Sequence, residues 1–337
     1  MSEHVSRPAR HYYLCGHEQF RPSDLLDHAA RAIRSGFDGI GCSDHVQPWW
    51  EGGESGHAWV WLGAAAQMTK TAPIGTAVTP SGPRYHPLLI AQAWATLEDM
   101  FPGRPYLGVG SGESLNESPL GAEWPSVEGQ IERMEEGLEM IRELFDGARI
   151  TRRGKYFAAD GAYLHTRPPR RPPIYVSAFG PQAAAVAGRW GDGVWTLADP
   201  KRAPEVIEAY QGAVEDAGRE PGEIILQALF SWAPDDERAL EGARPWKGAQ
   251  PDEYYRDDWH DPEAMYEHGE ETVSDDEFKQ AAIISADPDE HASRIREIER
   301  MGATIVALLN CSGADPLGAI DTYRDNVLPA LRGSAVA

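Results

Sequence analysis

Short apolar, β-branched runs alternate with amphipathic stretches along nearly the whole chain. Stretches such as LLDHAARAIRSG, LLIAQAWATLEDMF and IERMEEGLEMIRELFDG space their apolar residues as one face of a helix does. Strands that alternate with helices pair in parallel, so eight such units predict an α/β fold, a closed (β/α)8 barrel. The eight runs expected to be buried strands are residues 11–16, 39–45, 73–80, 105–112, 173–180, 193–198, 224–233 and 304–313.

Two stretches interrupt this alternation. Residues 148–172 have the pattern of a small hairpin, and residues 234–285 are long, acidic and rich in Tyr and Trp. Because these aromatic residues disfavour disorder, the second stretch is expected to be an ordered insertion in a barrel loop rather than a low-complexity linker. No boundary divides the chain, so residues 1–337 are expected to form one domain with two insertions.

Polar residues end several of the apolar runs. In a barrel of this kind the loops that follow the strands meet at one mouth, where the chemistry takes place. An imidazole beside carboxylates from other strand ends favours a catalytic site that contains His45, although a lone loop histidine is more often structural. The polar and aromatic residues that follow the first four runs are Glu18, Asp44, His45, Trp49, Thr79, Ser111, Glu113 and Asn116.

The fifth run ends in a turn of mostly small residues that leads into a helix, SAFGP at 177–181. Free backbone N–H groups at the start of a helix attract anions, as in the phosphate sites of many barrels. A plain connection between a strand and a helix fits the same pattern.

The net charge of the chain limits the classes of partner that it can bind. The sequence has 53 acidic and 31 basic residues, a formal net charge of −22, so no nucleic-acid partner is expected. Salt relieves repulsion among so many like charges, which favours a salt-adapted protein over a generic acidic enzyme. No apolar run approaches the roughly 20 residues of a membrane span, and no secretory signal is recognised, so a cytoplasmic location without a membrane partner is expected.

The spacing of metal-binding and nucleotide-binding residues is also informative. The three cysteines are far apart and lie in apolar runs, as core residues do. The histidines lack the spacing of metal ligands, so no metal is expected. Neither a dinucleotide-binding glycine motif nor a P-loop occurs in its required context.

Five segments carry a resemblance to a known family: GHEQF (16–20), SDHVQPW (43–49), LGVGSGESLNE (107–117), VSAFGP (176–181) and AGRWGDG (187–193). They are similar to the coenzyme F420-dependent glucose-6-phosphate dehydrogenases, a branch of the luciferase-like superfamily. The resemblance implies a luciferase-like TIM barrel, usually a homodimer, that binds coenzyme F420, an 8-hydroxy-5-deazaflavin, at its mouth.

The resemblance also implies roles for individual residues. His45 would take the hydroxyl proton of the substrate as a hydride leaves for the deazaflavin, and Glu113 would protonate or stabilise the reduced ring. Trp49 and Glu18 would flank the reacting atoms, and a non-proline cis peptide would join Ala77 to Val78. The residues expected to bind the cofactor are Asp44, Ala77, Val78, Asn116, Ser177, Ala178, Phe179, Gly180 and Pro181.

The chain departs from this family where a sugar phosphate would bind. Two lysines and an arginine hold the phosphate in the family; here Lys201 is displaced by about one position, and Gln280 and Glu297 replace the others. A glutamate repels phosphate, so a neutral alcohol or unphosphorylated sugar is favoured over glucose 6-phosphate. The nearby basic residues expected to contact the substrate are Lys201, Lys279 and Arg296.

These observations favour an F420-dependent dehydrogenase that acts on a secondary alcohol or a sugar hydroxyl. The alternatives are a dehydrogenase of glucose 6-phosphate, an FMN-dependent monooxygenase of the same superfamily, and a cofactor-binding protein without turnover. His45, Trp49 and Glu113 argue against the last, since all three are present.

Overall fold

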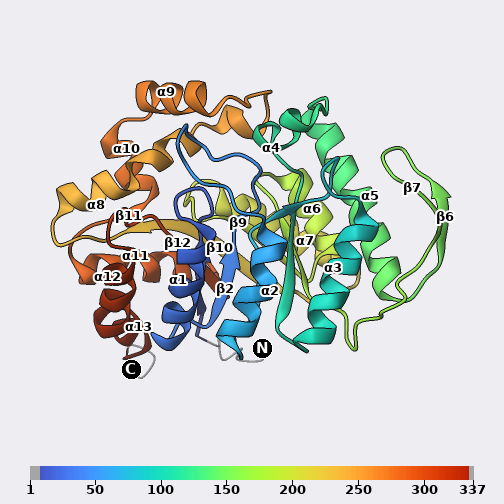
Figure 1. Ribbon diagram of the computed structural model, residues 1–337, viewed down its shortest axis with the longest axis horizontal. Coiled ribbons are helices and arrows are strands. Elements are labelled where there is room, and N and C mark those ends of the chain that lie inside the picture. The colour runs from blue at the N-terminus through green and yellow to red at the C-terminus, as the bar shows by residue number, and fades with distance from the viewer. Residues whose placement is uncertain (1–7, 334–337) are drawn as a thin grey trace.

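The computed structural model describes residues 8–333, and its centre is a closed ring of eight parallel strands (Figure 1). β10 pairs with both β9 and β12, and β12 pairs with β1, which closes the ring. Each of the eight apolar runs overlaps one ring strand, so the predicted barrel is confirmed. The ring strands are β1 (Arg10–Cys15), β2 (Gly39–Cys42), β3 (Ile74–Thr76), β5 (Pro105–Gly110), β8 (Ile174–Ser177), β9 (Gly193–Leu197), β10 (Glu223–Ser231) and β12 (Ile305–Asn310).

Helices surround the ring and bury one face against it. α1, for example, begins with a proline in its first turn, ends with basic residues in its last turn and buries Leu25 and Ala29. The helices outside the insertions are α1 (Pro22–Arg34), α2 (Ala58–Thr69), α3 (Pro87–Met100), α4 (Ser114–Glu117), η1 (Ser118–Leu120), α5 (Val127–Phe145), α6 (Pro181–Trp190), α7 (Ala203–Asp216), α11 (Pro288–Arg300), α12 (Pro316–Thr322), η4 (Tyr323–Val327) and α13 (Leu328–Gly333). Among the described helices, none is both long and apolar enough to cross a membrane.

The first insertion contains an antiparallel hairpin of β6 (Ile150–Arg153) and β7 (Ala158–Ala162), which projects beside α5 (Figure 1). The carboxylate of Glu136 in α5 accepts the backbone N–H groups of Lys155, Tyr156 and Phe157 at the hairpin turn. The turn of the hairpin is thus fixed to α5.

The second insertion folds into short helices at the end of the barrel where the strands finish (Figure 1). The buried ammonium of Lys247 lies 3.0 Å from Asp275 and 3.4 Å from Glu270, which ties its parts together. Residues 249–260 form its inner part, called here the roof segment. The elements of the insertion are α8 (Asp236–Ala243), η2 (Arg244–Ala249), η3 (Asp252–Tyr255), α9 (Pro262–Thr272), α10 (Asp275–Ala281) and β11 (Ile283–Ile284).

Large aromatic side chains fill the interior of the ring. The ring of Tyr106 lies 5.8 Å from that of Tyr12, 5.4 Å from Tyr175 and 6.2 Å from Trp195, and all four are buried. Apolar packing of this kind stabilises the barrel. Together these rings form a packed floor beneath the mouth.

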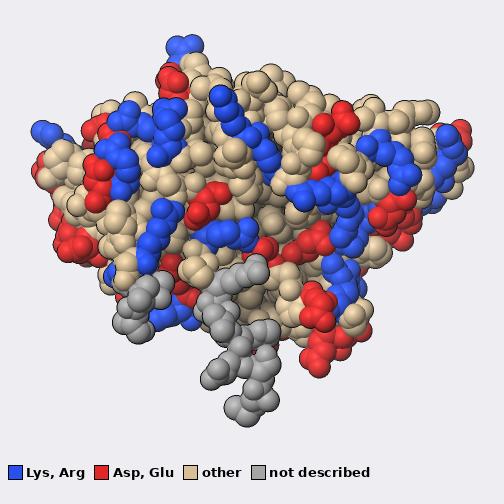
Figure 2. Space-filling view, turned by 90° about the horizontal axis from the view of Figure 1, so that it is seen from below, with Lys and Arg blue, Asp and Glu red and all other residues tan. Residues whose placement is uncertain are grey.

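Basic and acidic side chains are interleaved on the surface. Figure 2 shows both signs side by side over the face seen from below. Named pairs include Arg324 with Asp321 at 2.8 Å and Arg189 with Glu135 at 2.8 Å. Exposed pairs of this kind contribute little individually, and salt screens them.

Candidate active site

A cavity of about 1180 Å³ lies at the carboxyl ends of the barrel strands. The register of β1 with β2 places Cys15 opposite Cys42, so the residues just after these two strands emerge at the same level. The expected site residues that line the cavity are Glu18, Asp44, His45, Trp49, Ala77, Val78, Glu113, Asn116, Ser177, Phe179, Gly180, Pro181 and Lys201. Ala178 is buried behind the wall, with its backbone N–H bonded to the carbonyl of Trp195.

The imidazole of His45 lies between two carboxylates. Its Nε2 atom is 3.4 Å from Glu18 Oε1 and 3.3 Å from Glu113 Oε2. Its Nδ1 atom is 3.2 Å from the backbone carbonyl of Gln47. When Nδ1 carries the proton and donates it to this carbonyl, Nε2 is free to accept a proton at the cavity.

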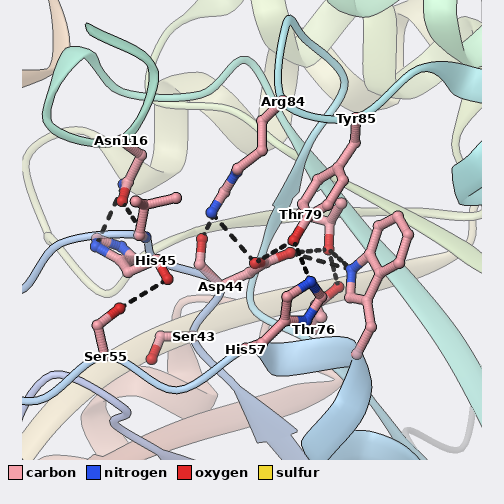
Figure 3. Close-up of polar contacts among 12 residues, drawn as sticks. Ser43, Asp44, His45, Ser55, His57, Thr76, Thr79, Arg84, Tyr85 and Asn116 are labelled. Carbon is pink, nitrogen blue, oxygen red and sulfur yellow. Dashed lines mark hydrogen bonds and ion pairs between the residues drawn. The ribbon is translucent and has the colours of Figure 1, made fainter. Parts of the chain in front are cut away.

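Asn116 lies against the loop of His45 (Figure 3) and also bonds to Glu113. Its Oδ1 atom accepts the backbone N–H groups of Val46 at 2.6 Å and Gln47 at 3.3 Å. Its Nδ2 atom donates to Glu113 Oε2 at 3.0 Å and lies 3.3 Å from His45 Nδ1. Asn116 therefore contacts both ionisable groups as well as the cavity.

Ser43 holds the carboxylate of Glu18, which is almost fully buried. The hydroxyl of Ser43 donates to Glu18 Oε2 at 2.7 Å and accepts the backbone N–H of His17 at 2.9 Å. A short bond of this kind fixes the carboxylate beside His45. The sequence interpretation did not include Ser43 among the site residues, although Ser43 precedes Asp44 and His45 directly.

Burial raises the pKa of the Glu113 carboxyl above its usual value, and the charge of Glu18 adds to the rise. His45, Arg84 and the hydrogen bond from Asn116 act in the opposite direction. A carboxyl with a raised pKa holds a proton more readily near neutral pH, so Glu113 is suited to acid–base work.

The carboxylate of Asp44 is satisfied by protein groups on one side of the cavity (Figure 3). Its Oδ2 atom accepts from Thr79 Oγ1 at 2.7 Å and from Trp59 Nε1 at 3.2 Å, and its Oδ1 atom lies 3.4 Å from Arg84. Arg84 also donates to the backbone carbonyl of Asp44 at 2.7 Å. Arg84 and Trp59 were missed from the sequence because neither follows a strand directly.

Aromatic rings cover the reacting groups. The ring of Trp49 lies 5.3 Å from that of His45, and Tyr255 of the roof segment lies 5.9 Å from Trp49 and 5.0 Å from Phe179. Tyr255 was also missed, and the only signal for it was the richness of the second insertion in aromatic residues. These rings give the space around His45 an apolar cover that limits the access of water.

The opposite wall is made by backbone and small side chains. A cis peptide bond joins Ala77 to Val78, and a Cβ atom added to Gly110 would lie 2.6 Å from Val78 Cγ2, so this approach requires glycine. α6 begins beyond Gly180, whose N-cap position offers no side chain to the first-turn N–H groups. A Cβ atom added to Gly180 would meet no described atom within 4 Å, so the start of α6 faces open space.

The outer rim of the cavity carries both signs of charge. Lys201 lines it, but Glu277 and Gln280 also line it, and Arg202 is bonded to Asp252 at 2.7 Å.

The structure does not bring Lys279 and Arg296 to the cavity. Arg296 donates to the carbonyl of Ala330 in α13, at 2.9 Å. It lies eight residues after Pro288, the start of α11, which is about 12 Å along the helix. Within residues 8–333, no group of three or more His, Cys, Asp or Glu side chains is arranged to hold a metal ion.

The sequence of this chain is similar to a known protein family and to several relatives. Residues 2–304 match the family model of the luciferase-like monooxygenases. An F420-dependent glucose-6-phosphate dehydrogenase from Nakamurella multipartita is 38% identical over 336 residues, which cover 96% of this chain and 97% of the relative. An F420-dependent hydroxymycolic acid dehydrogenase from Mycobacterium tuberculosis is 36% identical over 321 residues, which cover 94% of this chain and 86% of the relative.

A solved structure has a very similar fold. It is an F420-dependent secondary alcohol dehydrogenase in complex with an F420–acetone adduct, and it matches with a TM-score of 0.93 at 33% sequence identity. The match covers 97% of this chain and 100% of that one. The two structures are therefore similar over the barrel, its loops and its insertions.

Proposed function

Since the chain belongs to the luciferase-like monooxygenase family, we propose that it is an F420-dependent dehydrogenase that moves a hydride from a hydroxyl-bearing carbon to coenzyme F420. The observation that carries this proposal is the position of His45 Nε2, 3.4 Å from Glu18 and 3.3 Å from Glu113 inside the cavity. The relatives named above differ in the substrates of their names and share dependence on F420.

The cavity fits a flat cofactor with an anionic tail. Val78 and the backbone at Gly110 form a wall against which a ring can lie, and the open start of α6 at Gly180 and Pro181 suits an anion. When bound, F420 supplies a deazaflavin carbon that accepts a hydride. The protein orients the substrate, limits the access of water to the site and transfers the proton.

His45 acts as the base in this reaction. With Nδ1–H donated to the carbonyl of Gln47, Nε2 takes the proton of the substrate hydroxyl. The imidazolium that forms is stabilised by the carboxylates of Glu18 and Glu113, because both lie within 3.4 Å of Nε2. Ser43 keeps Glu18 in place. Glu113, whose pKa is raised, is suited to carry a proton beside His45.

The substrate is a neutral secondary alcohol or an unphosphorylated sugar. Only Lys201 of the three basic residues expected to contact a substrate lines the cavity, and the acidic Glu277 lines it as well. The lining arginines Arg84 and Arg202 are already paired with Asp44 and Asp252. A charge-assisted contact contributes about 1.5 to 3 kcal/mol, so a phosphate that lacks contacts with Lys279 and Arg296 binds weakly.

Kinetics with purified protein test both parts of the proposal. F420 is mixed with 2-propanol, glucose or glucose 6-phosphate, and the loss of absorbance of oxidised F420 is followed. Reduction of F420 by 2-propanol or glucose, at a higher kcat/KM than with glucose 6-phosphate, is expected. Turnover of the phosphate alone contradicts the neutral substrate, and binding of FMN in preference to F420 contradicts the dehydrogenase.

A homodimer is also proposed, formed through α2 and α3. These two helices expose Val60 (75% exposed), Met68, Leu89 and Met100, and large apolar side chains left exposed on a surface helix suit an interface between copies. Light scattering during size-exclusion chromatography should give twice the chain mass of 37.0 kDa. Val60→Glu should shift the protein toward the monomer, and a wild-type monomer contradicts the proposal.

A further inference from the structure

We propose that the ring of Tyr255 limits the length of the alcohol that the site accepts, so that the enzyme prefers short secondary alcohols. The inference rests on the proposed dehydrogenase function and adds a specificity-determining residue from the roof segment. Tyr255 ends η3, lines the cavity and lies 5.9 Å from Trp49, whose ring is 5.3 Å from that of His45. One aromatic ring therefore separates Tyr255 from the base.

The cavity beside Trp49 is lined by hydrocarbon. Trp246, Phe278 and Leu309 line it and belong, with Trp49, to one hydrophobic cluster against which Tyr255 packs. Chains of CH₂ groups gain about 0.8 kcal/mol for each methylene that such a wall buries. A substrate carbon chain that extends from His45 along this wall is thus favoured until a side chain blocks it.

Tyr255 stands where the apolar interior changes to the charged rim. Its chain neighbours Glu253 and Arg256 line the rim, and Glu253 is paired with His268 at 2.7 Å. The ring of Tyr255 instead turns inward, onto Trp49 and Phe179. A chain that grows away from His45 meets this ring before it reaches the rim.

The ring is held in place by the protein. Its hydroxyl donates to the carbonyl of Ala249 at 3.1 Å. The roof segment is fixed to the barrel by Ser114 Oγ, which donates to the carbonyl of Trp259 at 2.6 Å, and by Gln47 Nε2, which donates to the carbonyl of His260 at 3.0 Å. Burial and the nearby Glu113 carboxylate raise the pKa of Tyr255, so the phenol stays neutral and its role is steric.

A series of 2-alkanols tests the inference with the complete enzyme and F420. For the wild type, kcat/KM is expected to stop rising, or to fall, between 2-propanol and 2-hexanol. For Tyr255→Ala, each added methylene should increase kcat/KM by about fourfold, so three methylenes shift the ratio of 2-hexanol to 2-propanol by about 60-fold. Tyr255→Leu should give a smaller shift, and Tyr255→Trp should move the limit toward shorter chains.

Two matched variants separate the ring from a general loosening of the roof. Tyr255→Phe loses the bond to Ala249 but keeps the ring, so its ratio should match the wild type. Trp259→Ala removes a roof aromatic that stacks on His268, outside the residues that line the cavity, and should also leave the ratio unchanged. F420 affinity and melting temperature check that each variant is folded.

The outcomes distinguish this inference from the proposed function. If the wild type reduces F420 with 2-propanol but the Ala and Leu variants keep the wild-type ratio, Tyr255 does not limit chain length. A Trp259→Ala ratio that shifts as much as that of Tyr255→Ala also overturns the inference, because mobility of the roof would then explain the change. If the wild type reduces F420 with a sugar but with no 2-alkanol, the inference about Tyr255 fails and the dehydrogenase stands. If neither an alcohol nor a sugar reduces F420 with the wild type, the dehydrogenase proposal itself fails.

Discussion

Replacing Asn116 by alanine removes an amide that bonds to the N–H groups of Val46 and Gln47 and to Glu113 and that lies against His45. The N–H of Val46 loses its acceptor, a bond that contributes about 0.5 to 1.5 kcal/mol, and the bond to the Glu113 carboxylate contributes about 1.5 to 3 kcal/mol. Because neighbouring terms do not add, the free energy of unfolding should fall by about 2 to 4 kcal/mol.

The same substitution frees the loop that carries His45. A misplacement of about 1 Å at a reacting group costs on the order of 10²-fold in rate, so kcat for 2-propanol should fall by about 100-fold. The affinity for F420, measured by the quenching of its fluorescence, should change much less, because the Asn116 side chain bonds to the loop of His45 and to Glu113. Urea unfolding measures the change in the free energy of unfolding separately.

Asn116→Asp is the matched control. It keeps an oxygen to accept the N–H of Val46 but faces Glu113 with a second carboxylate in place of a donor. Stability should recover in part, while the added charge raises the pKa of Glu113 further and moves the pH profile of kcat upward. If Asn116→Ala keeps the wild-type kcat but binds F420 about 100-fold more weakly, Asn116 is a cofactor contact and the positioning argument is wrong.

Three further outcomes are expected. His45→Ala should lower kcat by about 10²- to 10⁴-fold with nearly unchanged F420 binding, the range for loss of a general base, and an effect confined to KM speaks against that role. Because the pKa of Glu113 is raised in the folded protein, its stabilising contribution is complete below the pKa of the unfolded chain and is lost as pH rises through the folded pKa. The wild type should therefore lose stability relative to Glu113→Gln as the pH rises above about 4, the ordinary pKa of a glutamate. A difference in melting temperature between the two proteins that stays constant with pH would argue against a raised pKa. Melting temperature and activity should rise from low to molar KCl as salt screens the net charge of −22, and a flat or falling melting temperature contradicts salt adaptation.

The sequence by itself determined the barrel and the location of its chemistry. Period-two and period-3.6 patterns report local burial, and a parallel barrel brings all strand ends to one mouth, so the fold and the grouping of Glu18, His45 and Glu113 follow from local pattern and topology. The run at 73–80 was predicted as one strand. In the structure it forms two, β3 and β4 (Thr79–Pro80), with the cis bond between Ala77 and Val78 lying between them.

The tertiary structure alone decided which polar groups contact one another. Ser43 holds Glu18, Arg84 pairs with Asp44, and Arg296 points to α13 rather than to the cavity. These contacts depend on rotamers and on the depth of each residue along its helix, which a one-dimensional pattern does not encode. Tyr255 reaches Trp49 only because a long insertion folds back over the mouth, and no local periodicity records where such a loop comes to rest.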